Sequence, residues 1–131
     1  MPRINTDKEI NLIHKELTGK IIKASYQVHN ILGPGYIESI YRNALLVELK
    51  NQGLKCDTEK EVQIYYMNVK VGTHRLDLVV ENQVIIELKA VSEFHPAHQA
   101  QVISYLKATG LKVALLLNFG KEKVEYKRFV F

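Results

Sequence analysis

The feature that most constrains this chain is the stretch from Asp77 to Lys89, in which charged residues interrupt two apolar runs. The runs 78–80 and 84–86 are separated by a short polar turn, which is the pattern of two strands joined in a hairpin. Asp77, Glu87 and Lys89 stand in surroundings too apolar for a solvated surface. Because burying an unpaired charge is costly, we expect these three groups to face one another, a metal ion or an open cleft.

The length of the turn decides whether Asp77 and Glu87 share a face. Side chains alternate along a strand, so Glu87 and Lys89 lie on the same face. If the turn is 81–83, Val80 pairs with Val84 and Asp77 lies opposite Glu87. A two-residue turn puts Asp77 on the other face unless a bulge restores the register. A shared metal site therefore requires an odd-numbered turn or a bulge.

Length and composition predict one domain over residues 1–131, since the chain has 47% hydrophobic and 24% charged residues. A single cysteine excludes an internal disulfide and a cysteine-cluster zinc site. The formal net charge of +4 permits nucleic-acid binding without requiring it. The longest apolar run, 113–117, is too short to cross a bilayer, and the N-terminus lacks the apolar core of a signal peptide. We expect no membrane segment and a cytoplasmic location.

Hydrophobic periodicity predicts the element order ααβββαββ and one α+β or α/β sandwich. A capping box at Thr6–Glu9 and an apolar stripe ending at Ile31 predict the first helix, which Gly33-Pro34-Gly35 terminates. The second helix is expected over about 36–49, with Ile37 and Ile40 on its inner side. The remaining predicted elements are strands 62–66, 69–80 and 84–91, a helix from Pro96 to about Thr109, and strands 112–117 and 123–130.

Two facing carboxylates are suitable ligands for Mg²⁺, with water in the remaining coordination positions. A metal ion held there lowers the pKa of a bound water and neutralises charge on a phosphate. Lys89, on the same face as Glu87, is placed to orient that water or to stabilise developing negative charge. An ion pair between Lys89 and either acid, with no metal, accounts for the three residues equally well.

Five further residues are candidates for the same site. His98, Gln101 and Tyr105 follow at i, i+3 and i+7 and so share one face of the predicted helix, where Gln101 is placed to hold a phosphate, a nucleotide or the lysine. An ordinary exposed helix face is the alternative. Glu38 is either an extra metal or water ligand or an acid favoured by the N-terminal helix dipole. Arg75 offers positive charge to a substrate phosphate, unless it simply ends a solvated strand.

These residues form an ordered set that resembles the PD-(D/E)XK nuclease superfamily. The matching motifs are Asp77, Glu87-Leu88-Lys89 and the Q-x-x-x-Y helix motif from Gln101 to Tyr105. The run 35–41, Gly-Tyr-Ile-Glu-Ser-Ile-Tyr, is similar to the signature of the GxxExxY family, a group of small proteins placed in that superfamily. The similarity continues through His98 and 105–107 to 116–120. One departure is Leu76, which stands where the superfamily's name has proline.

The resemblance implies a restriction-endonuclease-like core, in which a central mixed sheet is flanked by helices. It implies these site residues: Asp77 and Glu87 as metal ligands, Lys89 as the catalytic lysine, Glu38 as the acid of the first helix, and Gln101 and Tyr105 lining the site.

The expected activity is that of a Mg²⁺- or Mn²⁺-dependent nuclease acting on DNA or RNA. The alternative is an inactive module of the same fold that binds nucleic acid or a protein partner. Three tyrosines, Tyr36, Tyr65 and Tyr66, are candidates for a homodimer face if they are exposed.

Overall fold

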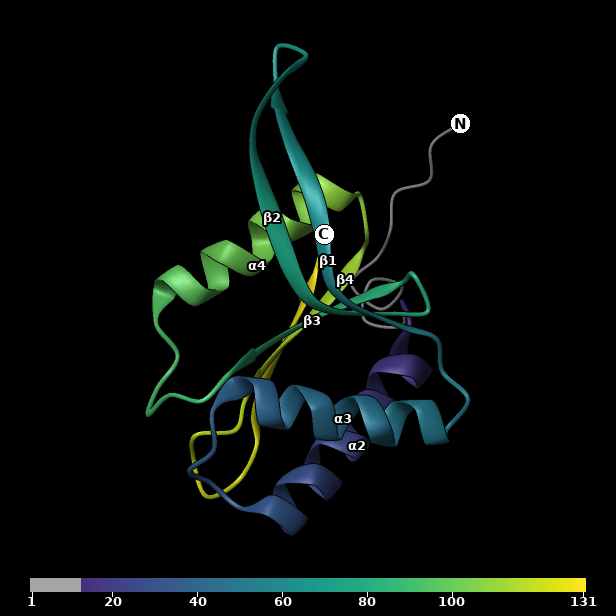
Figure 1. The fold of residues 1–131 in the computed structure, drawn as a ribbon, viewed down its shortest axis with the longest axis vertical. Helices are drawn as coiled ribbons and strands as arrows, with labels where there is room; N and C mark the ends of the chain where they lie inside the picture. Colours follow the sequence, from purple (N-terminus) through teal and green to yellow (C-terminus); the bar gives the residue numbers. More distant parts are fainter. Residues whose placement is uncertain (1–12) are drawn as a thin grey trace.

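The computed structural model describes residues 13–131, so the predicted capping box at Thr6–Glu9 lies outside the described range. The described elements are α2 (Lys15–Leu32), α3 (Glu38–Asn51), β1 (Cys56–Tyr66), β2 (Val69–Val80), β3 (Val84–Lys89), α4 (Pro96–Thr109), β4 (Val113–Asn118) and β5 (Glu125–Val130) (Figure 1). This order confirms the predicted ααβββαββ arrangement. None of the helices in residues 13–131 has the length and apolar character needed to cross a membrane.

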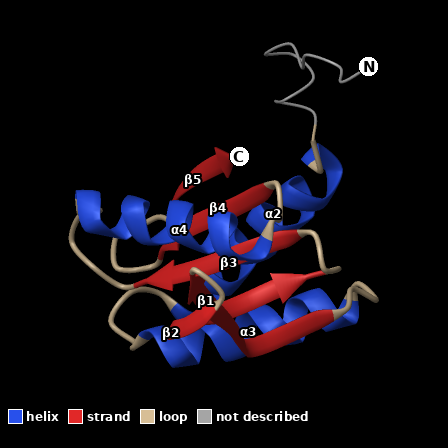
Figure 2. Cartoon of the chain, turned by 90° about the horizontal axis from the view of Figure 1, so that it is seen from above, coloured by secondary structure: helices blue, strands red, loops and turns tan. Residues whose placement is uncertain are grey.

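The five strands form one mixed sheet in the order β1-β2-β3-β4-β5. Strands β3 and β4 run parallel and are joined through α4, whereas the other neighbouring pairs are antiparallel. Figure 2 shows α3 and α4 on opposite sides of the strands. The sheet is therefore covered on both faces, as expected for a restriction-endonuclease-like α+β fold.

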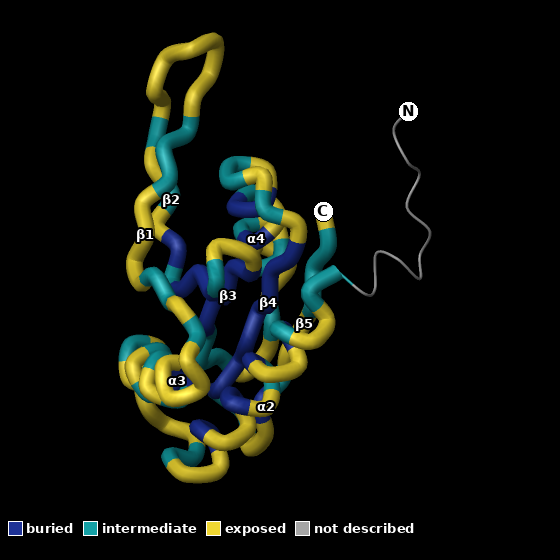
Figure 3. Tube along the Cα trace, turned by 90° about the vertical axis from the view of Figure 1, so that its right-hand side faces the viewer, coloured by how far each residue is buried: buried dark blue, intermediate teal, exposed yellow. Residues whose placement is uncertain are grey.

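Two hydrophobic clusters fill the space on either side of the sheet. Strand residues Leu78, Val80 and Ile86 pack with α2 and α3 in the first cluster. Val79 and Ile85 pack with α4 in the second. Because successive strand residues serve opposite clusters, β3 and β4 are buried on both faces and form the centre of the molecule (Figure 3).

Three isoleucines predicted to face the core lie on the surface instead. Ile31 is 67% exposed, Ile37 64% and Ile40 39%. Ile31 lies in the last turn of α2, and Ile37 precedes the first helical residue of α3, so its extended backbone takes it out of the helical period. In α3 the buried line begins at Tyr41 and repeats every four residues, which leaves Ile40 outside it.

The outer halves of β1 and β2 form an arm, defined as residues 60–76, that extends beyond the body of the molecule (Figures 1 and 3). Strand β2 pairs with β3 only from Leu78 to Val80, so within the sheet the arm consists of the β1–β2 pair alone. Its tip is a two-residue turn in which Met67 and Asn68 have φ of 49° and 65°, as in a type I′ hairpin. Strand β1 begins at Cys56, six residues before the predicted start, because this polar stretch shows no alternation in sequence.

The turn between β2 and β3 has three residues, 81–83. Val80 pairs with Val84, and the Gln83 N–H donates to the Val80 carbonyl at 2.9 Å. Glu81 and Asn82 both have φ of 53°, which closes the turn within these residues. The odd-numbered turn required for a shared site is thus confirmed, and the register places Asp77 opposite Glu87.

Candidate active site

Asp77 lies at a fork, the point at which β2 leaves β3 and continues with β1 alone. Regular β2–β3 pairing begins at Leu78, one residue after Asp77. The Asp77 carboxylate accepts a hydrogen bond from the Leu88 N–H, with Oδ2 and N 2.9 Å apart. The side chain therefore takes the place of a backbone acceptor between the separating strands, and this fixes the carboxylate against β3.

The alternation of β2 also breaks at the fork. Leu76 and Val79 lie in the same α4-side cluster although they are three residues apart, and Leu78 lies in the opposite cluster. On the β1 side, Glu59 has φ of 49° and its pairing with Asp77 is missing. The irregularity frees Asp77 from the ladder, so its carboxylate reaches the α4 side of the sheet.

Glu87 is buried on that side, next to Asp77. The residue is 4% exposed. Burial raises the pKa of Glu87 to about 9, with hydrogen bonding and charge repulsion from Asp77 as further causes, and the nearby Lys89 lowers it by less. The distance from Lys89 Nζ to Glu87 Oε2 is 3.6 Å. Lys89 is therefore in contact with Glu87, but its charge lowers the Glu87 pKa by less than burial and Asp77 together raise it.

The backbone following Lys89 is held by residues at the end of β4. The Phe119 N–H donates to the Lys89 carbonyl at 2.8 Å. Asn118 accepts from the Val91 N–H at 3.0 Å and donates to the Val91 carbonyl at 2.9 Å. A Cβ on Gly120 would lie 2.4 Å from the Val91 oxygen, so this close approach requires glycine. Sequence reasoning missed this support, although a polar residue ending the apolar run 113–117 signals it.

Tyr105 and Gln101 of α4 meet the acid pair on the same side of the sheet. Tyr105 is buried, and burial raises the pKa of its phenol above the ordinary value. Glu87 and Asp77 raise this pKa further by charge repulsion, while Gln101 lowers it by hydrogen bonding. Tyr105 is thus close enough to both acids for their charges to act on its phenol, and Gln101 lies one helical turn before it. Their roles in a reaction stay predictions.

His98 lies in the first turn of α4 and closes its N-terminus. Its Nδ1 accepts from the His95 N–H at 3.1 Å, while His95 Nδ1 accepts from the Ala97 N–H at 3.0 Å. Burial lowers the pKa of His98, and the charge of Lys89 lowers it further. His98 is therefore close enough to Lys89 to sense its charge, and one of its ring nitrogens is engaged in capping.

Glu38 is the first residue of α3 and is exposed. One turn later, the Tyr41 ring stacks on Phe119 with centroids 4.7 Å apart, and the Phe119 N–H bonds the Lys89 carbonyl. The start of α3 therefore lies near the end of β3 (Figure 1). Within residues 13–131 the Glu38 side chain forms no hydrogen bond or ion pair, so the structure brings it near the site without joining it to the acid pair.

Arg75 is placed away from the acid pair. It is an exposed arm residue whose Nη2 lies 3.2 Å from Glu61 Oε1 on β1. Its neighbours His74 and Leu76 both face α4, so alternation directs Arg75 to the opposite face. Its predicted role toward a substrate phosphate gains no support from this position.

The acid pair fits a divalent cation of the Mg²⁺ type. No cluster of three or more histidine, cysteine, aspartate or glutamate residues suited to a metal occurs in the described part of the chain. Two carboxylates with water and substrate phosphate oxygens are how Mg²⁺ is commonly held, whereas structural zinc requires four protein ligands. Because its pKa is raised, Glu87 keeps a proton in the metal-free protein, and a cation held by Asp77 and Glu87 would take the place of that proton.

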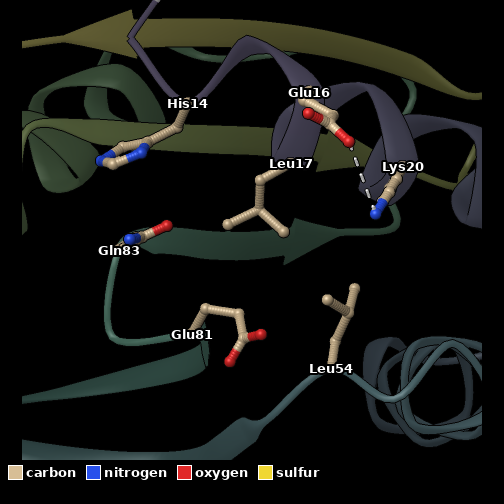
Figure 4. A pocket seen from close by; sticks show the side chains of 7 residues that line it. All are labelled: His14, Glu16, Leu17, Lys20, Leu54, Glu81 and Gln83. Atoms are coloured by element: carbon tan, nitrogen blue, oxygen red, sulfur yellow. Dashed lines mark ion pairs between the residues drawn. The ribbon is translucent and has the colours of Figure 1, made fainter.

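A cavity of about 520 Å³ lies elsewhere, at the opposite end of β3 from Lys89. Figure 4 shows its lining, which comes from the first turns of α2, from Leu54 and from the turn after β2. Glu16 and Lys20 there form an ion pair of 3.8 Å. None of the lining residues belongs to the fork, so this cavity is separate from the acid pair.

Comparison with known proteins identifies the family. The model of the PD-(D/E)XK nuclease superfamily matches residues 15–129, and the chain belongs to this superfamily. The crystal structure of SSO0001 is similar, with a TM-score of 0.57 and 20% identity over 92% of this chain and 60% of the other, a likeness that shows the fold alone. Comparison with proteins of curated function gives no match. Membership of the narrower GxxExxY family stays a prediction from the motif.

Proposed function

We propose that the protein is a Mg²⁺- or Mn²⁺-dependent nuclease that hydrolyses phosphodiester bonds in DNA or RNA. The observation that carries this proposal is the placement of Asp77 beside buried Glu87, with Lys89 Nζ 3.6 Å from the Glu87 carboxylate. A buried ion pair needs only one acid, so the second acid favours a site for a cation. Membership of a nuclease superfamily supports the same conclusion.

In this proposal Asp77 and Glu87 hold the cation through their carboxylate oxygens. When bound, the metal lowers the pKa of a water molecule and neutralises charge on the scissile phosphate. The Asp77 carboxylate is kept in position by the Leu88 N–H, and Glu87 by the rigid centre of β3. The protein thus presents both acids without having to order them when substrate arrives.

Lys89 supplies the positive charge of the site. Its side chain is 20% exposed, so it reaches from the buried Glu87 carboxylate toward solvent and substrate. There it orients the attacking water or stabilises negative charge developing on the phosphate. Tyr105, with its raised pKa, stays protonated and donates a hydrogen bond, and Gln101 offers an amide to the same space.

The test is cleavage of single-stranded and double-stranded DNA and RNA with Mg²⁺, Mn²⁺ or EDTA. Asp77→Ala and Lys89→Ala are each expected to reduce cleavage about 100-fold or more. Asp57→Ala, which removes an acid from the neighbouring strand β1, is the matched control and should cleave normally. Activity that survives both site substitutions would contradict the assignment.

Calorimetry separates the nuclease from an inactive module of the same fold. The active enzyme should release or absorb heat on binding Mg²⁺, and Asp77→Ala should abolish that signal. Nucleic-acid binding that needs no metal, with neither cleavage nor metal heat, would instead establish the inactive module.

A homodimer and a cytoplasmic location stay predictions from sequence. Tyr36, Tyr65 and Tyr66 are 45%, 64% and 65% exposed, so all three are accessible to a second copy of the chain.

A further inference from the structure

A groove lies between the arm and α4, on the same side of the sheet as the acid pair. Its volume is about 450 Å³, within the usual range of ligand pockets. Arm residues 63–65 and His74 line one side, and Ser104, Lys107 and Ala108 of α4 line the other. Figures 1 and 3 show α4 beside the lower part of the arm.

A single aromatic side chain separates this groove from the acid pair. The His74 and Tyr105 rings meet edge to face with centroids 4.8 Å apart. Ser104 Oγ lies 3.2 Å from His74 Nε2, which fixes the plane of the imidazole. Tyr105 in turn lies beside Glu87. A ligand in the groove is therefore a direct neighbour of the proposed catalytic centre.

The polar residues of α4 extend from the acid pair into the groove. Gln101, Ser104 and Lys107 follow at intervals of three and so form one line along the helix. Lys107 lies about 9 Å beyond Gln101 along the helix axis. It is exposed and forms no ion pair with other residues in 13–131. A nucleic-acid strand whose scissile phosphate is at Asp77 and Glu87 would pass Lys107 as it runs along α4.

The lining has the chemistry of a base-binding site. Ile64 and Ala108 supply apolar surface, His74 supplies a fixed aromatic ring, and Lys107 supplies a cation for phosphate. Unpaired bases bind by stacking on aromatic rings, histidine included, while neighbouring cations hold the backbone. The volume accommodates a nucleotide and is too small for a base-paired helix.

We propose that this groove binds an unpaired nucleotide of the substrate strand, with the base against His74 and a phosphate near Lys107. The inference rests on the proposed nuclease function for the position of the scissile phosphate. The substrate is accordingly a single-stranded or locally unpaired nucleic acid.

The test is fluorescence anisotropy with labelled 12-nucleotide pyrimidine strands. DNA and RNA are measured separately, each as a single strand and as a duplex, and EDTA is present throughout to prevent cleavage. The single strand should bind more tightly than the duplex. His74→Ala should weaken strand binding roughly 5- to 150-fold, the range expected for loss of one stacked base, and His74→Phe should retain most of the affinity. Abasic strands should bind the wild-type protein more weakly than normal strands do, and His74→Ala should weaken the binding of abasic strands little further.

Two further variants keep the test independent of His74. Ala108→Phe fills the groove while removing no contact, and it should weaken strand binding as His74→Ala does. Lys107→Ala should reduce the slope of log affinity against log salt by about 0.7, the value for one phosphate contact of a single strand. Lys112→Ala, an exposed lysine just beyond α4, is the matched control and should leave the slope unchanged.

Tighter binding of the duplex, or normal strand binding by both His74→Ala and Ala108→Phe, would overturn the groove assignment. Because binding is measured without metal, this result is distinguishable from failure of the proposed function. Wild-type protein that never cleaves but binds strands through His74 refutes the nuclease alone. Protein that cleaves normally with the groove filled refutes the groove alone.

Discussion

Replacing Glu87 with glutamine should stabilise the metal-free protein, and the gain should grow as the pH rises. Folding raises the pKa of the Glu87 carboxyl from 4.5 to about 9, chiefly through burial and then through Asp77. Between these pH values the folded chain keeps a proton that the unfolded chain releases, so the free energy of unfolding falls with rising pH. Glutamine has no such proton, so this source of pH dependence disappears.

The size of the effect follows from the pKa shift. Each pH unit above 4.5 costs the wild type about 1.4 kcal/mol, which amounts to roughly 3 kcal/mol at pH 7 and roughly 6 kcal/mol at pH 9. With a urea m-value of about 2 kcal/mol/M, the two proteins should differ by about 1.5 M in unfolding midpoint at pH 7. The difference should be small at pH 5.

The assay is urea unfolding in EDTA at pH 5.5, 7 and 8.5, followed by circular dichroism. Glu122→Gln, which alters an exposed acid, is the control and should follow the wild type. In buffer without EDTA, added Mg²⁺ should raise the wild-type midpoint and leave that of Glu87→Gln unchanged, because ligand binding stabilises only a protein that binds it. A gap that does not grow with pH, or a glutamine variant less stable than wild type at pH 8.5, would refute the account of Glu87.

Two other predictions concern the surroundings of the acid pair. Asn118→Ala leaves the Val91 N–H and carbonyl without partners and should lower the free energy of unfolding by about 1–3 kcal/mol per group. Asn118→Asp keeps the acceptor and should lose less stability in urea unfolding. Two variants as stable as the wild type would contradict the contact. Glu38→Gln should slow cleavage with an unchanged melting temperature if Glu38 belongs to the site, and normal cleavage with a loss of about 0.3–1 kcal/mol would identify it as a helix-dipole residue.

The hairpin register shows how much of the site was predictable from sequence. Strand alternation is a local property, so the sequence could state that Asp77 approaches Glu87 only if the turn is odd-numbered or a bulge is present, and the pairing of Val80 with Val84 meets that condition. The line from Gln101 to Tyr105 was predictable for the same reason, since helical spacing places both on one face.

The errors arose where one segment depends on another far away in the chain. Simple alternation puts Arg75 and Asp77 on the same face of β2, but the alternation breaks where β2 gains β3 as a second neighbour, and the role of Arg75 toward a phosphate stays a prediction. The contact of Asn118 with Val91 joins residues 27 positions apart, so the polar residue that ends the run 113–117 marks one partner and no local pattern identifies the other. Ile37 and Ile40 were misplaced because Ile37 is the extended residue before α3 and the buried line of α3 runs through Tyr41, Leu45 and Leu49.

The division of β2 has a consequence for how this protein can change. Its inner residues, 78–80, are fixed by burial on both faces, whereas the arm packs against the body on its α4 side. Residues can be added to or removed from β1 and β2 next to the Met67–Asn68 turn, two at a time in each strand, without altering which side chains face α4. The length and surface of the arm are therefore free to diversify and to suit new ligands, while the carboxylate at its base keeps the same position.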